Sequence, residues 1–387
     1  MEDEQTMLDE RRLIDFAKEL IRTPSLSMEE AAVSRVVQRE MTLLDYDDVQ
    51  VDDLFNVMGV IRGSGKGPTL MFNGHIDHAD VGNMADPFSA QEIDGRAFGH
   101  DGPVIYGRGA CDMKGAVAAM IHAGGMLKKA GIPLSGDVWV TCVAREEMAR
   151  GEGIRRLLEN GLTADFAVSG EATGLDIYVG HRGKFETRIT THGRTSHGGY
   201  PQGGINAIFK MNSFLNALQS EYPLPDHDFL GKATVTVLDI CASPGALTPI
   251  VPDRCEAIVD RRFFPEETET ALLEGFEEIF RALKAEDPEF QAEAEPLKWF
   301  PAMFTEPAEP IVQAMSKARQ TVLGDAGKIG AWYFGVDGTF INQAGIPCVG
   351  FGPGNEYLAH TPQDVVPVRH LVDAAKVYAR LIKDVCR

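Results

Sequence analysis

The feature that most limits how this chain can fold is a set of short, wholly apolar runs separated by helical patterns. Residues 136–144 (GDVWVTCVA) and 164–170 (ADFAVSG) lack the polar alternation of half-exposed strands, so we expect both to be buried on both faces. Residues 8–22 and 114–131 instead carry apolar side chains at helical spacing. Strands that alternate with helices predict an α/β fold, in which a mostly parallel sheet is covered by helices.

The pattern changes after about residue 177 and returns to the first style after residue 297. Between these points we expect a strand with one wet face at 176–193, a helix at 204–220, strands near 232–240 and 254–264, and a helix at 265–284. These elements predict a small α+β layer. We therefore expect one domain made of residues 1–177 and 297–387, with residues 178–296 inserted as a second, smaller domain.

Length, charge and cysteine usage exclude several classes of protein. A chain of 387 residues favours two domains, and its formal net charge of −20 argues against a nucleic-acid partner, because no basic face meets phosphates. The sequence has no membrane-spanning apolar run, and its acidic N-terminus lacks the pattern of a secretory signal. The six cysteines are scattered without a CxxC pair, which favours a reducing cytoplasm.

Ionisable side chains follow the predicted buried strands at several separate places. In open α/β sheets the carboxyl ends of the strands form the binding crevice, so neighbouring strands would bring these groups together. Each group alone has an ordinary explanation as a loop, cap or surface residue, but carboxylates that converge in a poorly solvated site cannot all stay ionised without a cation. The groups are His75 with Asp77, Asp112, Glu146 with Glu147, Glu171, and His360.

The charges of these groups favour two metal ions. Asp112, Glu147 and Glu171 carry three negative charges as ligands, while His75 and His360 are neutral when they bind a metal. Two divalent ions and one bridging hydroxide make such a cluster neutral. Imidazole and carboxylate ligands suit Zn²⁺, with Co²⁺ or Mn²⁺ as substitutes.

Two acidic residues remain beside the predicted ligands. Asp77 lies two residues beyond His75 and is expected to accept the second ring N–H of that histidine, which would fix its tautomer. Glu146 lies next to Glu147 and is expected to act as the general base that takes a proton from the metal-activated water.

Several segments resemble the motifs of a known enzyme family. GHID, GRGACDMKG, REE, GE and AHTP occur in the order and spacing of the M20 family of dizinc metallopeptidases and deacylases, which includes acetylornithine deacetylases, succinyl-diaminopimelate desuccinylases, aminoacylases and carboxypeptidases. GRTSHGGYPQGGINAI resembles that family's dimerisation-domain motif, and VDRRFFPEE resembles the following strand and turn. GHRGKFE, FLGKATVTV and GIPCVGFGPG are similar to a branch of hydrolases linked to selenium metabolism. The resemblance implies a zinc-peptidase type of α/β domain with an inserted dimerisation, or lid, domain.

The resemblance also assigns roles to matching positions. One metal ion would be bound by His75, Asp112 and Glu171, and the other by Asp112, Glu147 and His360, with Glu146 as the general base.

Three further residues receive roles from the resemblance alone. His197 resembles the histidine that the small domain of one subunit supplies to the active site of the other in a homodimer, although it could also be a surface residue. Arg262 resembles the arginine that binds the substrate carboxylate, with a salt bridge to Asp260 as the alternative. Asp337, in FGVDGTFI, lies in a segment on the substrate side, where Gly335 and Val336 replace the hydroxyl residues that relatives usually carry.

The implied function is a metal-dependent amidohydrolase that cleaves N-acyl amino acids or short peptides with a free carboxylate. Glutamate at the position of Glu171 is typical of acylases and carboxypeptidases, whereas aspartate there is typical of aminopeptidases. An aminopeptidase or dipeptidase, and a metal-binding homologue without hydrolytic activity, are the alternatives.

Two loops near the predicted ligands carry further signals. Ser27 and Glu30 have the spacing of a capping box at the start of a helix. His78 stands where relatives usually carry threonine or valine, and we expect it to lie in a loop or behind the ligands.

Overall fold

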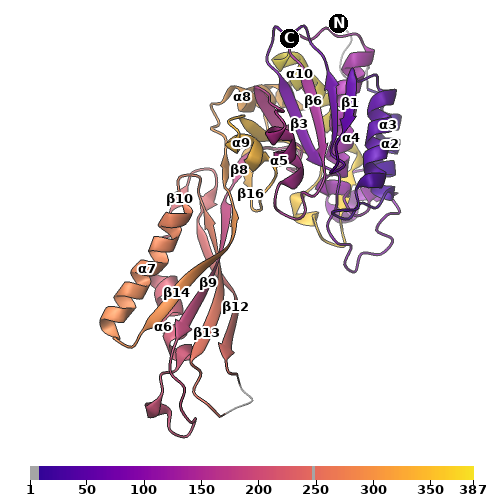
Figure 1. The fold of residues 1–387 in the computed structure, drawn as a ribbon. Coiled ribbons are helices and arrows are strands. Elements are labelled where there is room, and N and C mark those ends of the chain that lie inside the picture. Colours follow the sequence, from indigo (N-terminus) through magenta and orange to yellow (C-terminus); the bar gives the residue numbers. More distant parts are fainter. Residues whose placement is uncertain (1–7, 246–248) are drawn as a thin grey trace. The chain divides into compact units, whose positions relative to one another are not determined.

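The computed structural model describes residues 8–245 and 249–387 and divides the chain into two compact units (Figure 1). Unit 1 consists of the described residues up to Gly180 together with Phe304–Arg387, and unit 2 consists of His181–Met303. Each unit has a hydrophobic core of its own. Unit 2 is therefore a folded body inserted into the chain of unit 1.

Unit 1 is built on a mixed sheet whose central strands are parallel. Its strands are β1 (Asp48–Val51), β2 (Val57–Ile61), β3 (Leu70–His75), β6 (Val138–Val143), β7 (Phe166–Ser169), β8 (Ile177–His181), β15 (Met303–Phe304), β16 (Ile329–Trp332) and β17 (Cys348–Gly350). The order is β1-β2-β6-β3-β7-β17-β8-β15, and β16 pairs with β8. β6, β3, β7 and β17 run parallel, whereas β2 is antiparallel to β6 and β8 is antiparallel to β17. The predicted α/β fold with a mainly parallel central sheet is confirmed.

Helices pack on both faces of this sheet, which explains why its central strands are apolar (Figure 1). β3 is buried along its whole length, and β6 is buried at every residue except Trp139. The helices are α2 (Glu10–Arg22), α3 (Ala31–Leu43), α4 (Gly115–Lys129), α5 (Glu152–Glu159), α8 (Pro310–Leu323), α9 (Gly338–Gln343) and α10 (Val368–Val385). Helix α4 packs against α2 and α10, while α5 packs against α9. A small separate sheet of unit 1 has the order β18 (Val365–Pro367), β5 (Pro103–Tyr106), β4 (Gln91–Asp94). None of the described helices is long and apolar enough to cross a membrane.

The single strand expected at 176–193 is two strands in different sheets. β8 ends at His181 in the sheet of unit 1. β9 (Gly183–His192) is a central strand in the sheet of unit 2. Alternating polarity indicates a half-exposed strand, but it does not say which sheet the strand joins. Just before the change of sheet, Gly180 has a φ of 153°, a conformation that favours glycine.

Unit 2 is an antiparallel sheet with two helices packed on one face. The strand order is β12 (Thr234–Ser243), β13 (Arg254–Phe263), β9, β14 (Gln291–Phe300), and every pair is antiparallel. Helices α6 (Ala207–Glu221) and α7 (Glu269–Glu286) supply Phe214 and Phe276, which form a core with Phe185 and Ile189 of β9. A short hairpin, β10 (Asp226–His227) and β11 (Gly231–Lys232), precedes β12.

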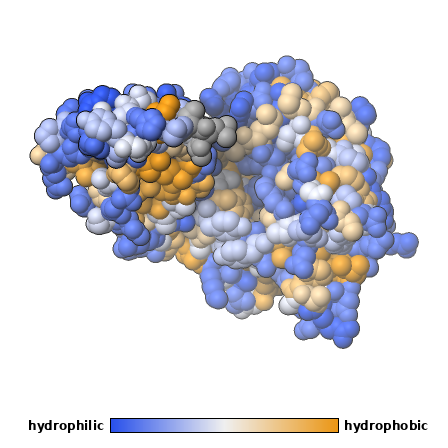
Figure 2. Space-filling view, turned by 90° about the horizontal axis from the view of Figure 1, so that it is seen from below, coloured by the Kyte–Doolittle hydropathy of each residue, from blue (hydrophilic) through white to orange (hydrophobic). Residues whose placement is uncertain are grey.

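The edge strand β12 of unit 2 is unusually apolar for an exposed strand. Val237, Leu238 and Ile240 expose 40%, 54% and 50% of their surface. In Figure 2 hydrophobic residues, in orange, form patches among the hydrophilic residues, in blue, that make up most of the visible surface. An exposed edge strand offers unpaired main-chain groups to another chain, and natural proteins normally protect such edges with charge.

Candidate metal centre

The five predicted ligands lie at the carboxyl edge of the sheet of unit 1. His75 is the last residue of β3, while Glu147, Glu171 and His360 follow β6, β7 and β17. These strands are parallel neighbours, so their carboxyl ends lie along one edge. Asp112 reaches the same place from the turn Ala110–Lys114, which leads into α4.

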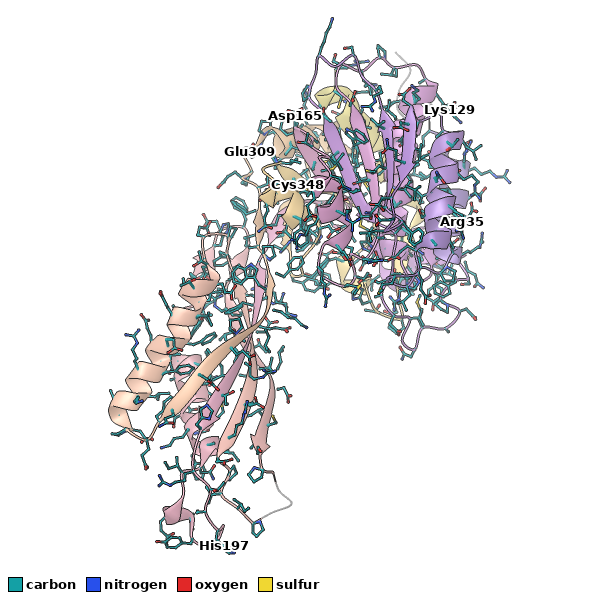
Figure 3. All side chains as sticks on the ribbon, in the orientation of Figure 1. Arg35, Lys129, Asp165, His197, Glu309 and Cys348 are labelled. Atoms are coloured by element: carbon teal, nitrogen blue, oxygen red, sulfur yellow. The ribbon has the colours of Figure 1, made fainter. Side chains whose placement is uncertain are left out.

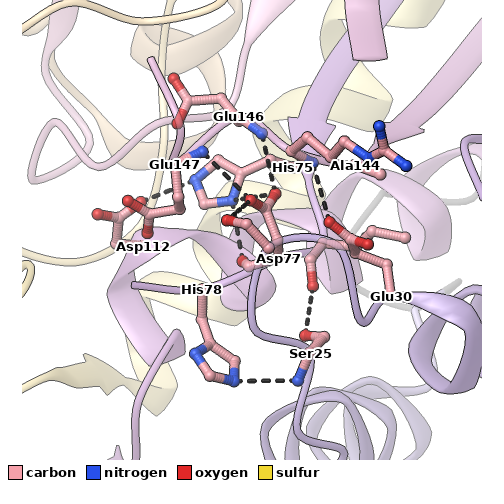
Figure 4. Close-up of polar contacts among 12 residues, drawn as sticks. Ser25, Glu30, His75, Asp77, His78, Asp112, Ala144, Glu146 and Glu147 are labelled. Atoms are coloured by element: carbon pink, nitrogen blue, oxygen red, sulfur yellow. Dashed lines mark hydrogen bonds and ion pairs between the residues drawn. The ribbon is translucent and has the colours of Figure 1, made fainter. Parts of the chain in front are cut away.

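Asp112 lies between the two histidines. Its Oδ1 is 2.9 Å from His75 Nε2, and its Oδ2 is 3.1 Å from His360 Nε2. Glu171 Oε1 lies 3.5 Å from His75 Nε2, and Glu147 Oε2 lies 2.8 Å from His360 Nε2. Ligand atoms about 2.0 Å from a tetrahedral zinc ion are about 3.3 Å from one another. The structure therefore brings atoms of these five residues to separations that suit metal ligands, with Asp112 between the two histidines. Figure 4 shows Asp112 beside His75 and Glu147.

The charges of these groups call for cations at the site. Burial raises the pKa of Glu147 and raises that of Glu171 well above its usual value. Hydrogen bonds to Asp112 and Glu147 raise the pKa of His360 to about 10. Burial opposes protonation of His75, but Glu171 and Asp112 raise its pKa well above the usual range. Protons on the histidines supply positive charge in the protein alone, and bound metal would replace them. The donor set thus fits two divalent metal ions.

Glu146 lies beside the ligand groups. One of its carboxyl oxygens, a ring nitrogen of His75 and a carboxyl oxygen of Glu171 lie within 4.8 Å of one another. Burial raises the pKa of Glu146 well above its usual value, and the charge of Asp337 adds to this effect. Glu146 is therefore a carboxyl group that can exchange a proton at the centre.

Asp77 is held differently from the expectation. His75 Nδ1 lies 3.0 Å from the main-chain oxygen of Asp77, whereas carboxylate atom Oδ1 lies 3.6 Å from the same nitrogen, too far for a hydrogen bond. The carboxylate instead accepts the main-chain N–H groups of Glu146 and Glu147, each at 3.2 Å, and the hydroxyl group of Ser27 at 2.7 Å. The prediction that the ring of His75 donates to the carboxylate of Asp77 is wrong, because the main-chain carbonyl of Asp77 already faces that ring nitrogen (Figure 4).

The capping box expected from Ser27 and Glu30 is also not formed. Helix α3 begins directly after Glu30, and no side chain caps its first turn. Ser27 bonds to Asp77, and Glu30 Oε1 accepts the N–H groups of Met28 at 2.9 Å and Arg145 at 3.1 Å. Both residues thus contact loops near the metal centre rather than the helix that they precede.

His78 joins two loops behind the ligands. Its Nε2 accepts the main-chain N–H of Ser25 at 3.0 Å, and its Nδ1 donates to the carbonyl of Ala79 at 2.8 Å. Burial lowers its pKa to about 4, so the ring is neutral. Its position therefore matches the expectation of a loop residue behind the ligands.

The remaining predicted residues lie in different surroundings. Asp337 is buried at the start of α9, its Oδ2 has no hydrogen-bond partner in the described part of the chain, and burial raises its pKa to about 7. Arg262 belongs to unit 2, where its Nε lies 2.8 Å from Asp260 Oδ1 and its Nη2 lies 3.2 Å from Oδ2. His197 lies in an exposed loop of unit 2, where its Nδ1 accepts the N–H of Gly199 at 3.0 Å (Figure 3). Arg262 thus forms the salt bridge to Asp260 that was the alternative to a role in substrate binding.

One buried carboxyl group at the site was not expected at all. Asp364 Oδ2 accepts the N–H of Gly109 at 2.7 Å, and its Oδ1 accepts that of Cys111 at 2.9 Å. The only signal for it in the sequence is its place shortly after His360.

Comparison with known proteins agrees with this geometry. Residues 71–384 match the family model described as Peptidase family M20/M25/M40. The uncharacterised protein YgeY of Escherichia coli strain K12 is 33% identical over 385 residues, which cover 95% of this chain and 92% of YgeY. The N-formyl-4-amino-5-aminomethyl-2-methylpyrimidine deformylase of Bacillus subtilis is 27% identical, with 86% of this chain and 83% of the deformylase covered.

Solved structures share the fold over its whole length. The aminopeptidase PepT of Bacillus cereus superposes with a TM-score of 0.81 at 22% identity, covering 98% of this chain and 99% of PepT. The YXEP protein of Bacillus subtilis, a dinuclear metal-binding peptidase from the M20 family, gives a TM-score of 0.76 at 21% identity, covering 97% of this chain and 98% of YXEP. Since the family model spans most of the chain, the protein belongs to peptidase family M20/M25/M40 and is a metallohydrolase that acts on carbon–nitrogen bonds.

Proposed function

We propose that the protein is a dizinc amidohydrolase that cleaves N-acyl amino acids or short peptides with a free carboxylate. The position of Asp112 between His75 and His360 carries the proposal, with Glu171 and Glu147 completing the two groups. A carboxylate shared by two such groups suits a pair of zinc ions, and cobalt or manganese could substitute.

Glu146 supplies the proton transfers in this proposal. When bound, the two ions would polarise the amide carbonyl and lower the pKa of the attacking water. Glu146 takes a proton from that water as the new carbon–oxygen bond forms. It then gives the proton to the amine nitrogen as the carbon–nitrogen bond breaks, so a carboxylic acid and an amine are released.

The relatives support an amide bond as the target. One is named as a deformylase and others as peptidases, so small acyl groups and single peptide bonds are the first candidates. Arg262 would bind the substrate carboxylate in exchange for its bond to Asp260, and Asp337 would lie on the substrate side. The aminopeptidase fold of PepT makes cleavage of peptides with a free amine the second candidate.

We further propose a homodimer in which His197 acts in the active site of the partner subunit. The apolar edge strand β12, with Val237, Leu238 and Ile240 exposed, supports pairing with a second chain. His197 lies in an exposed loop of unit 2, which leaves its ring available to another subunit.

The cytoplasm is the proposed location. All six cysteines are free in the structure, and five of them are buried. Thiols that stay unpaired are typical of a reducing compartment.

The test is the variant Glu146→Gln, measured on N-acetyl, N-formyl, N-succinyl and N-carbamoyl amino acids and on free and blocked dipeptides. We expect kcat to fall by about 1,000-fold on the best substrate, because general-base catalysis is worth roughly 100- to 10,000-fold. Two zinc ions per chain should remain, since Glu146 is not one of the five proposed ligands. The exposed residue Glu159 on α5 offers the matched control Glu159→Gln, which should behave as wild type.

Three outcomes would change the proposal. Unchanged kcat in Glu146→Gln would remove this residue from the mechanism. Cleavage only of peptides with a free amine would favour the aminopeptidase. Full metal content without metal-dependent turnover on any substrate would favour a binding protein that does not hydrolyse.

A further inference from the structure

Glu30 and Asp364 are among the buried carboxyl groups of unit 1 that are neither proposed ligands nor the proposed base. Glu30, which precedes α3, and Asp364, which precedes β18, are both fully buried. Burying a carboxyl group is unfavourable unless its partners compensate, so the contacts of each group indicate what it does.

Within the described residues, the hydrogen bonds of the Glu30 carboxylate come from main-chain groups. Its Oε1 accepts the N–H of Met28 and the N–H of Arg145, while its Oε2 is buried with no hydrogen-bond partner in the described part of the chain. The guanidinium group of Arg145 points elsewhere, since its Nη1 donates to Glu152 Oε1 at 2.9 Å. Glu30 is therefore not the partner of the Arg145 charge; it holds the peptide.

The peptide that Glu30 holds lies directly before the two functional glutamates. Arg145 has a φ of 62°, a left-handed conformation that is strained for a residue with a side chain. The next two N–H groups, of Glu146 and Glu147, are bound by Asp77. Two buried carboxyl groups thus hold three consecutive N–H groups of this loop (Figure 4).

Asp364 holds the other ligand loop in the same way. Its two oxygens accept the N–H groups of Gly109 at 2.7 Å and Cys111 at 2.9 Å, and Cys111 directly precedes Asp112. Gly109 is also left-handed, with a φ of 82°. The guanidinium of Arg108 is further away, at 3.3 Å, so the main-chain bonds are the closer contacts of this carboxyl group.

We propose that Glu30 and Asp364 are positioning residues of the metal centre, each fixing the main chain next to a metal-binding side chain. Glu30 sets the place of Glu147, and Asp364 sets the place of the shared Asp112. The inference rests on the proposed metal centre. Groups behind metal ligands typically contribute 10- to 100-fold, roughly, to metal affinity or activity, and a displacement of about 1 Å can cost about 100-fold in rate.

The hydrogen-bond pattern predicts opposite results for the two conservative variants. Glu30 uses one oxygen for both bonds, so the amide oxygen of Glu30→Gln can accept the same two N–H groups. Asp364 uses both oxygens, so Asp364→Asn must turn an NH₂ group towards a main-chain N–H. Glutamine should therefore replace Glu30, whereas asparagine should fail to replace Asp364.

The experiment is a Co²⁺ titration of metal-free protein followed by visible absorption, together with kcat and KM on the best wild-type substrate. Glu30→Ala should lower the affinity for one of the two Co²⁺ ions by about 10-fold. It should also lower kcat by about 100-fold with little change in KM. Asp364→Asn should lower the affinity for both Co²⁺ ions, because both proposed sites share Asp112 as a ligand. Glu30→Gln should stay within about threefold of wild type in both measurements.

The control is a buried carboxyl group within α3, the helix that Glu30 precedes. Glu40 of α3 is paired with Arg12 and His122 and lies away from the site, so Glu40→Ala should lower thermal stability without changing Co²⁺ binding or kcat. Wild-type Co²⁺ affinity in Glu30→Ala and Asp364→Asn would overturn the inference, as would equal losses in Glu30→Gln and Glu30→Ala. Absence of Co²⁺ binding by the wild type would instead overturn the metal centre itself, and the inference with it.

Discussion

Removal of the metal ions should destabilise unit 1 and leave unit 2 unchanged. All five predicted ligands belong to unit 1, whereas unit 2 has a hydrophobic core of its own. An ion that binds only the folded state, at about 1,000 times its dissociation constant, stabilises that state by about 4 kcal/mol, so two ions contribute about 8 kcal/mol. Unit 1 spans about 260 residues, which gives an unfolding entropy of about 0.55 kcal/mol/K. Its melting temperature should therefore fall by about 15 °C.

Differential scanning calorimetry of the zinc-loaded protein, before and after dialysis against EDTA, measures this shift. The transition of unit 2 serves as an internal control, and added Zn²⁺ should restore the transition of unit 1. His360→Ala removes a ligand from only one of the two groups and should show about half of the shift.

The reasoning is refuted if EDTA removes the metal, as checked by elemental analysis, and the transition of unit 1 does not move. An equal shift of both transitions would also contradict it, because it would mean that the ions do not act through unit 1 alone.

Three further predictions concern the dimer and the stability of unit 1. Mixing inactive His197→Ala with inactive Glu146→Gln should restore about a quarter of wild-type activity, because half of the dimers are hybrids with one complete site each; no recovery would argue against action across subunits. Leu238→Lys on edge strand β12 should convert the dimer to a monomer in light scattering, and an unchanged mass would contradict the proposed interface. Burial opposes ionisation of Glu40, but its hydrogen bonds with His122 and Arg12 lower its pKa to about 2, from an ordinary 4.5, so its contribution is complete above pH 4.5 and is lost as the pH falls towards 2. The difference in unfolding free energy between wild type and Glu40→Gln should thus be about 3 kcal/mol at pH 6 and shrink below pH 4.5; a constant difference in urea titrations would contradict this.

The central sheet and its ligand edge could be predicted because both depend on local patterns. Strands such as β3 and β6 are apolar throughout, since helices cover both of their faces. Parallel strands place their carboxyl ends together, so His75, Glu147 and Glu171 could be expected to meet before any distance was known.

The contacts of Asp77 and Glu30 could not be predicted, because both bind main-chain N–H groups of a distant loop. Every residue except proline carries such a group, so it leaves no mark in the sequence. The spacing of Ser27 and Glu30 fits a capping box equally well, and the contacts of the folded chain outweighed that local preference. The break between β8 and β9 was missed for a related reason, since side-chain alternation does not identify the partner strand.

The inserted segment leaves and rejoins the rest of the chain at neighbouring points. In the first sheet β8 and β15 lie next to each other, with the N–H of Thr305 donating to the carbonyl of Val179 at 2.8 Å. In the second sheet β9 and β14 are also neighbours, and Lys184 lies opposite Phe300. Strands paired in this way are about 5 Å apart, a gap that a tight turn can close. The sheet of unit 1 could therefore keep its pairing if a gene lost this segment or exchanged it for another, whereas the proposed roles of Arg262 and His197 would be lost with it.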